Sequence, residues 1–246
     1  MTTLLQVPLL QVQGVTKRFG GFTALEDIRV DIRQGERFGL IGPNGSGKTT
    51  LINCISGVLA SDAGTVRFDG QDITRLPAFK RTHRGIARSF QVPRPFRSMT
   101  VLENLLVALD FGVLEHGLSS RQADAEAEAI LDKIGLSAKA NVSSGQLSQV
   151  ELRKMELARA MASRPKLLIS DEAMAGLAGA EVDEVLEVLF RLNGEGITVI
   201  MIEHIMQAVM RFSERVMCLD AGKIICEGTP AQVTADKRVQ EAYLGV

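Results

Sequence analysis

The chain has 246 residues, 46% of them hydrophobic, and a formal net charge of −1. A chain of this size and apolar content buries a substantial core as one domain, which excludes disorder. The near-neutral charge gives no basic field that would favour nucleic acid as the main partner. The first ten residues lack the pattern of a secretion signal, and no apolar run approaches the roughly 18 residues of a membrane span. We therefore expect any membrane association to depend on a partner protein.

Two strands are expected ahead of residue 36. Residues 9–15 alternate apolar and polar side chains, and residues 24–32 fit a second strand. Phe19 is expected in the loop between them. A phenylalanine in a turn usually covers core, but one that lies about twenty residues before a phosphate-binding loop can also stack on an adenine ring. The local pattern leaves both interpretations open.

A glycine-rich stretch joins the apolar strand of residues 38–41 to a helical apolar period that begins at Thr50. Its G-x-x-x-x-G-K-[ST] pattern arises by chance in a chain this long on the order of once in a hundred, which disfavours a turn that merely caps a helix. Lys48 would reach the β- and γ-phosphates of a nucleotide, and the Thr49 hydroxyl would reach Mg²⁺. The predicted nucleotide-binding residues are Gly42, Pro43, Asn44, Gly45, Ser46, Gly47, Lys48, Thr49 and Thr50.

A basic segment follows a strand expected at residues 65–68. Residues 73–102 hold seven lysines or arginines and no acid. Such a run is usually a solvated face, and a surface for lipid headgroups or an acidic partner stays open as the alternative. Within the segment, residues 85–91 are expected as a strand that ends at Gln91. The seven basic residues are Arg75, Lys80, Arg81, Arg84, Arg88, Arg94 and Arg97.

The middle of the chain is predicted to be helical. Thr100 and Glu103 have the spacing of a reciprocal helix cap, and the helix that they begin continues through Leu109. Residues 120–134 fit a second helix, acidic and rich in alanine. This section interrupts the pattern of strands and helices on either side of it.

Two later strands are predicted to deliver polar residues at their ends. One apolar strand leads into Asp171 and Glu172, and a second, residues 197–202, leads into Glu203 and His204. Beside a phosphate loop, Asp171 would hold Mg²⁺ through its water shell and Glu172 would polarise the attacking water. A strand that ends in surface acids and a structural histidine are the simpler alternatives. The ends of neighbouring parallel strands are nevertheless the usual location of ligand sites.

The order of these motifs resembles that of the ATP-binding-cassette (ABC) ATPases over nearly the whole chain. The motifs are, in sequence, the aromatic loop, the phosphate loop, Gln91, the helical section, Asp171-Glu172 and His204. Within that family, the chain is most similar to the ATPase subunits of branched-chain amino-acid-type importers. The matching stretches are residues 16–21, 88–91, 99–108, 202–204 and 241–245.

The resemblance implies an α/β fold with a RecA-like P-loop NTPase core, an antiparallel β-subdomain and an inserted α-helical subdomain. Residues 1–246 would form one ABC ATPase domain, with the core at residues 1–91 and 156–246 and the helical subdomain at about 92–155. ATP and Mg²⁺ are the implied cofactors. By resemblance, Phe19 stacks on the adenine, and Gln91 couples the Mg²⁺ site to the permease. The implied catalytic residues are Lys48, Glu172 as the general base, and His204 as a γ-phosphate contact. The implied metal-site residues are Thr49, Gln91 and Asp171.

The family signature, Leu-Ser-Gly-Gly-Gln or a close relative, is altered in this chain and fits two registers. Residues 142–146, Val-Ser-Ser-Gly-Gln, look like it, but the following helix, matched through residues 156–160, places the signature at residues 147–151, Leu-Ser-Gln-Val-Glu. The five-residue shift rotates the start of the helix by about 140°. Both registers could form a capping box, so the helical phase selects Ser148 as the nucleotide-binding serine.

In this family, two subunits hold each ATP between the phosphate loop of one and the signature of the other. Gln149 and Val150 replace the signature glycines, and the β-branched Val150 is expected to obstruct close approach to the γ-phosphate. Since the chain's own phosphate loop and carboxylates are complete, the pattern predicts a heterodimer with a related ATPase subunit, in preference to a homodimer. Ala173, Met174 and Ala178 also depart from the family pattern and are expected to weaken cross-talk between the two sites.

The sequence thus predicts the ATPase subunit of an ABC importer, at the cytoplasmic face of the inner membrane, beneath membrane-spanning permease subunits. An external solute-binding protein would be an indirect partner, and no nucleic acid is expected. The solute would be a branched-chain amino acid or a related small polar or organic-acid compound. Two alternatives stay open: a soluble ABC ATPase in DNA repair or translation, and a catalytically weak structural subunit of a transporter.

Overall fold

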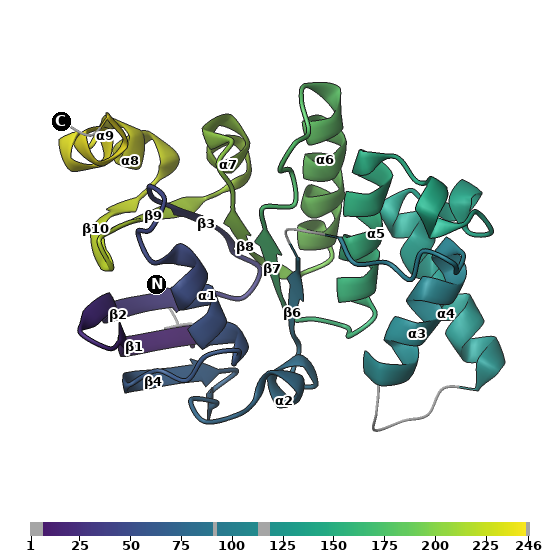
Figure 1. Cartoon of the computed structure of the whole chain (residues 1–246), viewed down its shortest axis with the longest axis horizontal. Coiled ribbons are helices and arrows are strands. Elements are labelled where there is room, and N and C mark those ends of the chain that lie inside the picture. The colour runs from purple at the N-terminus through teal and green to yellow at the C-terminus, as the bar shows by residue number, and fades with distance from the viewer. Residues whose placement is uncertain (1–6, 91–92, 113–118, 245–246) are drawn as a thin grey trace, which may run out of the picture.

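The computed structural model describes residues 7–90, 93–112 and 119–244, and its centre is a six-stranded sheet (Figure 1). The strand order is β10-β9-β3-β8-β7-β6, with β9, β3, β8, β7 and β6 parallel and β10 antiparallel at the edge. The parallel order makes one edge of the sheet the meeting point of the strand ends. The strands are β3 (Arg37–Ile41), β6 (Ile86–Ser89), β7 (Leu167–Asp171), β8 (Thr198–Ile202), β9 (Arg215–Asp220) and β10 (Lys223–Gly228).

A second sheet is antiparallel and comes from the start of the chain. Its order is β2 (Phe22–Ile32), β1 (Leu10–Phe19), β4 (Ala63–Phe68) and β5 (Gln71–Asp72). The prediction that Phe19 lies in a loop is wrong, because Phe19 is the last residue of β1 and pairs with Phe22 across the turn at Gly20 and Gly21. Its ring is still 49% exposed, so it is open to a ligand at the sheet's edge.

Helix α1 (Lys48–Ser56) lies between the two sheets (Figure 1). Its apolar residues Leu51 and Ile52 belong to one core that also holds residues from both sheets, such as Val12 and Ile169. Leu168, the neighbour of Ile169 in β7, belongs to the core on the opposite face of the sheet, as alternation along a strand requires. Helices α6 (Ala180–Gly194) and α7 (Met206–Phe212) contribute to that second core.

The helical middle section lies at the end of the six-stranded sheet beyond β6 (Figure 1). It contains α3 (Val101–Gly112), α4 (Ser120–Ile134), the 3₁₀ turns η1 (Ser137–Lys139) and η2 (Ser144–Gln146), and α5 (Gln149–Met161). Thr100 and Glu103 exchange the predicted cap hydrogen bonds at the start of α3. The subdomain boundaries at 91/92 and 155/156 stay predictions, and α5 runs through the second of them without a break.

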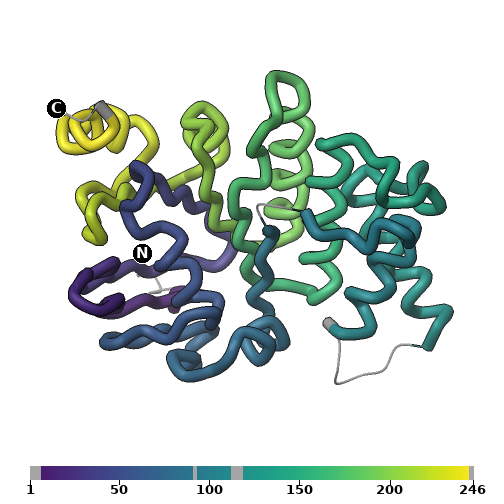
Figure 2. Tube along the Cα trace, viewed as in Figure 1, coloured from purple at the N-terminus to yellow at the C-terminus, as the bar shows by residue number. Residues whose placement is uncertain are grey.

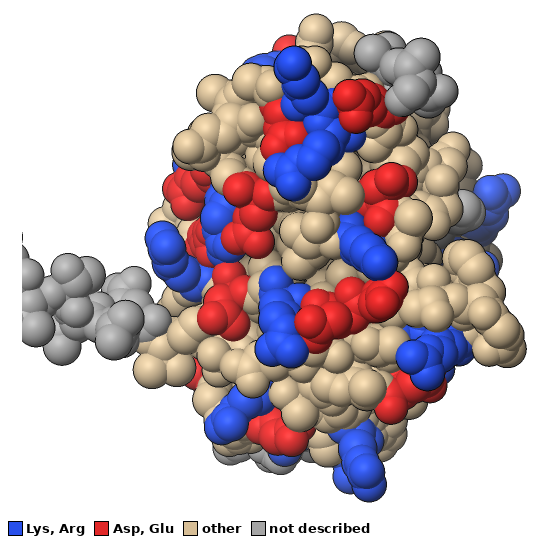
Figure 3. Space-filling model, turned by 90° about the vertical axis from the view of Figure 1, so that its left-hand side faces the viewer, with Lys and Arg blue, Asp and Glu red and all other residues tan. Residues whose placement is uncertain are grey.

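The tube in Figure 2 shows that the first and last described parts of the chain, β1 and α9, lie on the side of the molecule opposite the helical section. The last residues that the structure describes form helix α9 (Lys237–Leu244), which follows α8 (Pro230–Ala235). On the face seen in Figure 3, acidic and basic side chains are interspersed. Among the described residues, no helix combines the length and apolar character of a membrane span.

The basic segment is not a uniformly solvated face, because Arg81, in helix α2 (Ala78–Thr82), is only 2% exposed. Its guanidinium donates to the carbonyls of Cys54 and Ile55 at 2.7 and 2.8 Å, and to those of Leu76 and Thr74 at 2.8 and 2.9 Å. Burial lowers the pKa of Arg81. The two carbonyls of α1 are in its last turn, so Arg81 caps the helix that begins at the phosphate loop.

We predict that Arg81→Met lowers the free energy of unfolding by about 3 kcal/mol, because four carbonyl groups lose their buried partner while the side-chain volume changes little. Urea denaturation followed by circular dichroism measures this change. Lys80→Met, at an exposed neighbour in the same helix, should change stability by less than about 0.5 kcal/mol. Equal effects of the two substitutions would contradict the capping role.

Candidate functional site

The stretch from Gly42 to Lys48 forms a loop between β3 and α1 whose shape depends on glycine. Gly42 and Gly47 have φ angles of 149° and 106°. A Cβ atom on Gly42 would lie 2.1 Å from the carbonyl oxygen of Leu219, and one on Gly47 would lie 2.7 Å from that of Ala24. No side chain fits at either position, so the loop curls with backbone N–H groups at the start of α1, as anion binding requires.

Lys48 points back into this loop. Its ammonium donates to the carbonyl oxygens of Gly42 at 2.7 Å and Pro43 at 2.9 Å. Burial lowers the pKa of Lys48, while the carboxylates of Glu172 and Asp171 oppose that shift. The third donor contact of the ammonium, at 3.5 Å, is to the hydroxyl of Ser46. A cation hydrogen-bonded to neutral oxygens in this way is available to an incoming phosphate, whose negative charge it would bind more strongly.

Asp171 lies at the end of β7, where its carboxylate is paired with Arg88 of β6. Nη2 of Arg88 lies 2.5 Å from Oδ2 of Asp171, and Nη1 donates to Oδ1 of Asn53 in α1 at 2.7 Å. Both charged side chains are largely buried, with exposed fractions of 14% and 11%. Arg88 thus joins Asp171, the predicted metal-site carboxylate, to the helix that follows the phosphate loop. The interpretation of residues 73–102 as a solvated basic face is wrong for this arginine.

Glu172 and His204 come from neighbouring strands and face one another. Nε2 of His204 lies 3.0 Å from Oε1 of Glu172, and the N–H of Glu172 donates to the carbonyl of Ile202 at 2.9 Å. Glu172 has a φ of 50°, an uncommon conformation for a residue other than glycine. The pairing of β7 with β8 therefore brings together the general base and the γ-phosphate contact that the sequence predicts.

Ser148 caps α5, as the chosen signature register requires. Its Oγ accepts from the N–H of Glu151 at 3.3 Å, and its own N–H donates to the Glu151 carboxylate at 2.8 Å. Ser148 and Gln149 are exposed, but Val150 is only 9% exposed and packs in the helical core. The expected obstruction by Val150 is therefore wrong, because its side chain turns inward. Gln149 is the substituted residue that a second subunit would meet.

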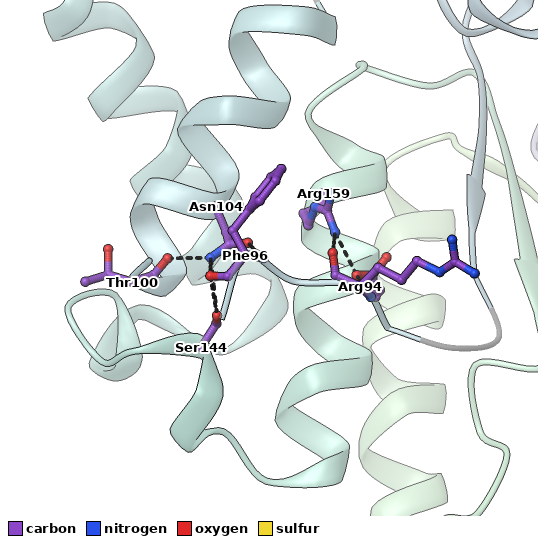
Figure 4. Close-up of polar contacts among 7 residues, drawn as sticks. Arg94, Phe96, Thr100, Asn104, Ser144 and Arg159 are labelled. Carbon is purple, nitrogen blue, oxygen red and sulfur yellow. Dashed lines mark hydrogen bonds and ion pairs between the residues drawn. The ribbon is translucent and has the colours of Figure 1, made fainter. Parts of the chain in front are cut away.

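The competing register has a structural role instead. Ser144, in η2, is buried and donates to the carbonyl of Phe96 at 2.9 Å, and Asn104 of α3 bonds both the N–H and the carbonyl of Phe96 (Figure 4). On the other side of this segment, Arg159 and Glu156 of α5 bond the backbone of Arg94. These contacts fix residues 94–96 to the helical section.

The loop after Glu172 is held by charged residues. The N–H of Met174 donates to Oε1 of Glu203 at 2.8 Å, and Arg153 of α5 donates to the carbonyl of Ala175 at 2.8 Å. Glu203 is 3% exposed, and burial raises its pKa to about 7, with Glu172 adding to the shift and the Met174 N–H and Arg153 opposing it. The loop is thus tied both to the end of β8 and to the helix that begins at Ser148.

A cleft of about 740 Å³ opens beside these groups. Its lining includes Thr49, Asp171 and Glu172 from the strand ends and α1, and also the exposed rings of Phe90 and Phe111. The cleft connects the predicted reaction centre with an apolar surface at the helical section.

The sequence profile of the ABC transporter family matches residues 25–175. The chain belongs to this family. A second profile, of the branched-chain amino acid ATP-binding cassette transporters, matches residues 223–246. This ABC protein is therefore an ATPase of the transporter type, and its α/β fold is the predicted one.

Individual relatives agree with this assignment. A high-affinity branched-chain amino acid transport ATP-binding protein of Pseudomonas aeruginosa is 37% identical over 250 residues, covering 97% of this chain and 98% of its own length. The protein of the same description from Escherichia coli is 38% identical, with the same coverage. An ATP-binding cassette solved in its ADP conformation superimposes with a TM-score of 0.87 at 33% identity, over 97% of this chain and 99% of its own. A dimeric cassette bound to ADP and phosphate gives 0.79 at 26% identity, over 90% and 98%.

The structure brings most of the predicted site residues of this ABC ATPase to one region. Lys48 and Thr49 begin α1, and Asp171, Glu172 and His204 lie at the ends of adjacent strands of the same sheet. Gln91 lies outside the described residues. Phe19 and Ser148 lie in the antiparallel sheet and the helical section, and their contacts with nucleotide stay predictions.

Three residues of the site were missed or misassigned from sequence. Arg88 was counted in a solvated run, Glu203 was noted only as the neighbour of His204, and Arg153 was not singled out. The one available signal was the position of Arg88 in the expected strand that ends at Gln91, since alternation along that strand puts every second residue on one face.

We predict that Glu203 makes stability fall as pH rises. Its pKa is about 7 in the fold, above the value of about 4.5 for an exposed glutamate, so the folded state binds the extra proton between these values. The free energy of unfolding should therefore decrease by about 3 kcal/mol between about pH 4 and pH 8, with most of the loss between pH 5 and pH 7. Glu203→Gln keeps an acceptor for Met174 without the charge and should show a flatter profile in urea denaturation. Glu187→Gln, at an exposed residue of α6, should keep the wild-type slope, and parallel profiles for all three proteins would refute the assignment.

Proposed function

We propose that this chain powers the uptake of a branched-chain amino acid, or of a related small polar or organic-acid solute, as one of two ATPase subunits beneath a membrane-spanning permease. The observation that carries this proposal is the match of residues 223–246 to the branched-chain amino acid transporter profile, outside the part common to all ABC proteins. The names of the full-length relatives support it. They favour an importer over a soluble ABC ATPase in DNA repair or translation.

In the proposed mechanism the phosphate loop binds the β- and γ-phosphates, and Lys48 moves from the carbonyls of Gly42 and Pro43 onto them. Glu172 accepts a proton from the attacking water, and His204, 3.0 Å from it, contacts the γ-phosphate and keeps the carboxylate in place. The positive charge of Lys48 stabilises the transition state in a partly buried setting.

The residues present also suit Mg²⁺. The Thr49 hydroxyl offers a hard oxygen ligand, and the Asp171 carboxylate would hold the ion through its water shell. This fits Mg²⁺, which commonly takes only one or two protein ligands beside the phosphates and keeps several waters. Within the described part of the chain, no cluster of three or more His, Cys, Asp or Glu residues could hold a metal alone, so we expect the ion to arrive with ATP. Bound there, Mg²⁺ would neutralise charge on the phosphates.

The cleft supports contact with a permease. Phe90 and Phe111 are 56% and 72% exposed, and Phe96 is held on the fixed segment 94–96. Exposed aromatic rings around a cleft favour a protein partner. A permease segment seated there would contact the same cleft that Asp171 and Glu172 line, so solute transport and hydrolysis could influence one another. The proposal includes a position at the cytoplasmic face of the inner membrane, with a solute-binding protein as an indirect partner on the other side.

We predict that Lys48→Ala lowers ATPase activity of the assembled transporter by about 10²–10³-fold and weakens ATP binding, because the main cation on the transferred phosphate is lost. Uptake of radiolabelled leucine, isoleucine and valine into proteoliposomes should stop as well. Lys133→Ala, at a partly exposed lysine of α4 paired with Glu195, is the control and should retain both activities. ATP-driven uptake of urea, an amide or an aromatic acid alone would keep the ATPase assignment and reassign the solute.

We further propose that the second ATPase subunit is a related but different chain. Gln149 stands on the exposed start of α5, and its Nε2 lies 3.4 Å from the carbonyl of Ala175. A larger polar side chain at a signature glycine would meet the nucleotide of the facing subunit. The other predicted catalytic and metal-site residues of this chain are present, namely Lys48, Asp171, Glu172 and His204. A nucleotide on this chain's own phosphate loop would therefore be completed by the unaltered signature of a partner.

Paired variants in the assembled complex test this asymmetry. Glu172→Gln here should reduce ATPase activity by more than about tenfold, since it removes the base of the faster site, and the matching substitution in the partner should cost less than about twofold. Gln149→Gly should raise the activity that remains in the Glu172→Gln complex. Equal losses from the two carboxylate variants, or a fully active homodimer of this chain, would show that the altered signature is competent.

A further inference from the structure

The C-terminal helix reaches the phosphate loop through one side chain. The phenol oxygen of Tyr243, in the last turn of α9, accepts a hydrogen bond from the backbone N–H of Gly42 at 2.8 Å, although 201 residues separate the two in sequence. Gly42 is buried and is the first residue of the loop. The Glu-Ala-Tyr-Leu-Gly sequence at residues 241–245 thereby contributes a contact to the nucleotide site.

The N–H of Gly42 needs a partner at this point. The parallel pairing of β3 with β9 ends at Ile41 and Cys218, and the next residue turns away with a φ of 149°. The carbonyl of Leu219 is so close that any Cβ on Gly42 would lie 2.1 Å from its oxygen. A buried N–H without a partner is costly, and the Tyr243 hydroxyl takes the place of the strand partner that is missing here.

Helix α9 is seated firmly enough to hold that hydroxyl. Val239, one helical turn before Tyr243 and on the same face, is 4% exposed, and Val233 of α8 is fully buried. Helix α8 packs on β9 and β10, and α9 packs on α8 and β10. Tyr243 itself is 42% exposed, but its phenol end reaches the buried Gly42, and this partial burial raises the pKa of Tyr243 to about 12, so the phenol stays neutral at physiological pH.

The backbone of Gly42 is therefore held on both sides of its Cα atom in the nucleotide-free protein. Tyr243 holds its N–H, and the Lys48 ammonium holds its carbonyl at 2.7 Å. An incoming nucleotide draws the ammonium onto the phosphates and removes the second support. We propose that Tyr243 is a positioning residue that keeps the entrance of the phosphate loop in place when Lys48 leaves it, so that the C-terminal helix is part of the nucleotide site. This rests on nucleotide binding and not on the solute transported.

Tyr243→Phe tests the proposal, because it removes only the hydroxyl. Binding of Mg·ADP and of ATP, measured by calorimetry, should weaken by about tenfold, since the backbone on both sides of Gly42 gains freedom once Lys48 departs. At saturating ATP in the assembled complex, kcat should stay within about twofold of wild type while KM rises, because Tyr243 does not touch the reacting atoms. Glu241→Gln, at an exposed residue two positions earlier on the same helix, should leave both constants unchanged.

A merely structural role predicts a different result. In that case Tyr243→Phe would lower Tm equally with and without Mg·ADP and leave the dissociation constants unchanged, and this outcome would overturn the proposal. A second measurement uses the nucleotide-free protein. In a Lys48→Met background both supports of Gly42 are gone, so Tyr243→Phe should lower Tm by more than it does alone. Additive losses would also argue against the joint support of Gly42 by these two side chains. Binding of Mg·ADP to the wild-type protein is measured beside the variants. If the wild type does not bind Mg·ADP, the assignment of the nucleotide site itself fails, whereas wild-type binding leaves the result for Tyr243→Phe as the test of this proposal.

Discussion

The close approach of two carbonyl groups to the phosphate loop is the constraint on which the rest of the site depends. One carbonyl, of Leu219, belongs to the six-stranded sheet, and the other, of Ala24, belongs to the antiparallel sheet. The loop and α1 lie between these sheets, so the loop takes its shape only when both sheets are in place (Figure 1). Glycine at 42 and 47 is what allows this approach, since neither position has room for a Cβ atom. The antiparallel sheet is thereby part of the phosphate site, and it also carries Phe19 at the end of β1.

Much of this arrangement was predictable from the sequence because it depends on short-range patterns. The phosphate loop has a fixed spacing, and the strand ends that carry Asp171, Glu172 and His204 are short apolar runs followed by polar residues. Helical phase also placed the start of α5 at Ser148 correctly, because a capping box and the apolar period of a helix are both local. What the pattern could not give was the direction of individual side chains. Val150 faces inward because α5 packs against α3 and α4, and those contacts come from distant parts of the chain.

The charged residues were the least predictable part. Arg81 and Arg88 stand in a segment without acids, and composition assigns such residues to solvent. Arg81 is buried because the last turn of α1 leaves carbonyls without partners, and Arg88 is largely buried because Asp171 and Asn53 converge on it. Neither partner is near in sequence. A buried arginine is stable only when its donors are satisfied, so its location depends on the tertiary fold and not on the charge of its neighbours along the chain.

The departures from the family pattern meet in space, although two motifs far apart in the chain carry them. Gln149, at an altered signature position, contacts the backbone of Ala175, and a Cβ atom on Gly176 would lie 2.6 Å from its amide nitrogen. The same loop carries Met174, whose side chain is fully buried and whose N–H donates to Glu203. The signature helix and the loop after the catalytic carboxylate therefore form one unit within this chain, joined further by Arg153. In the proposed heterodimer, the signature helix and this loop would both face the second subunit, so a partner with the usual signature glycines would meet both altered motifs together.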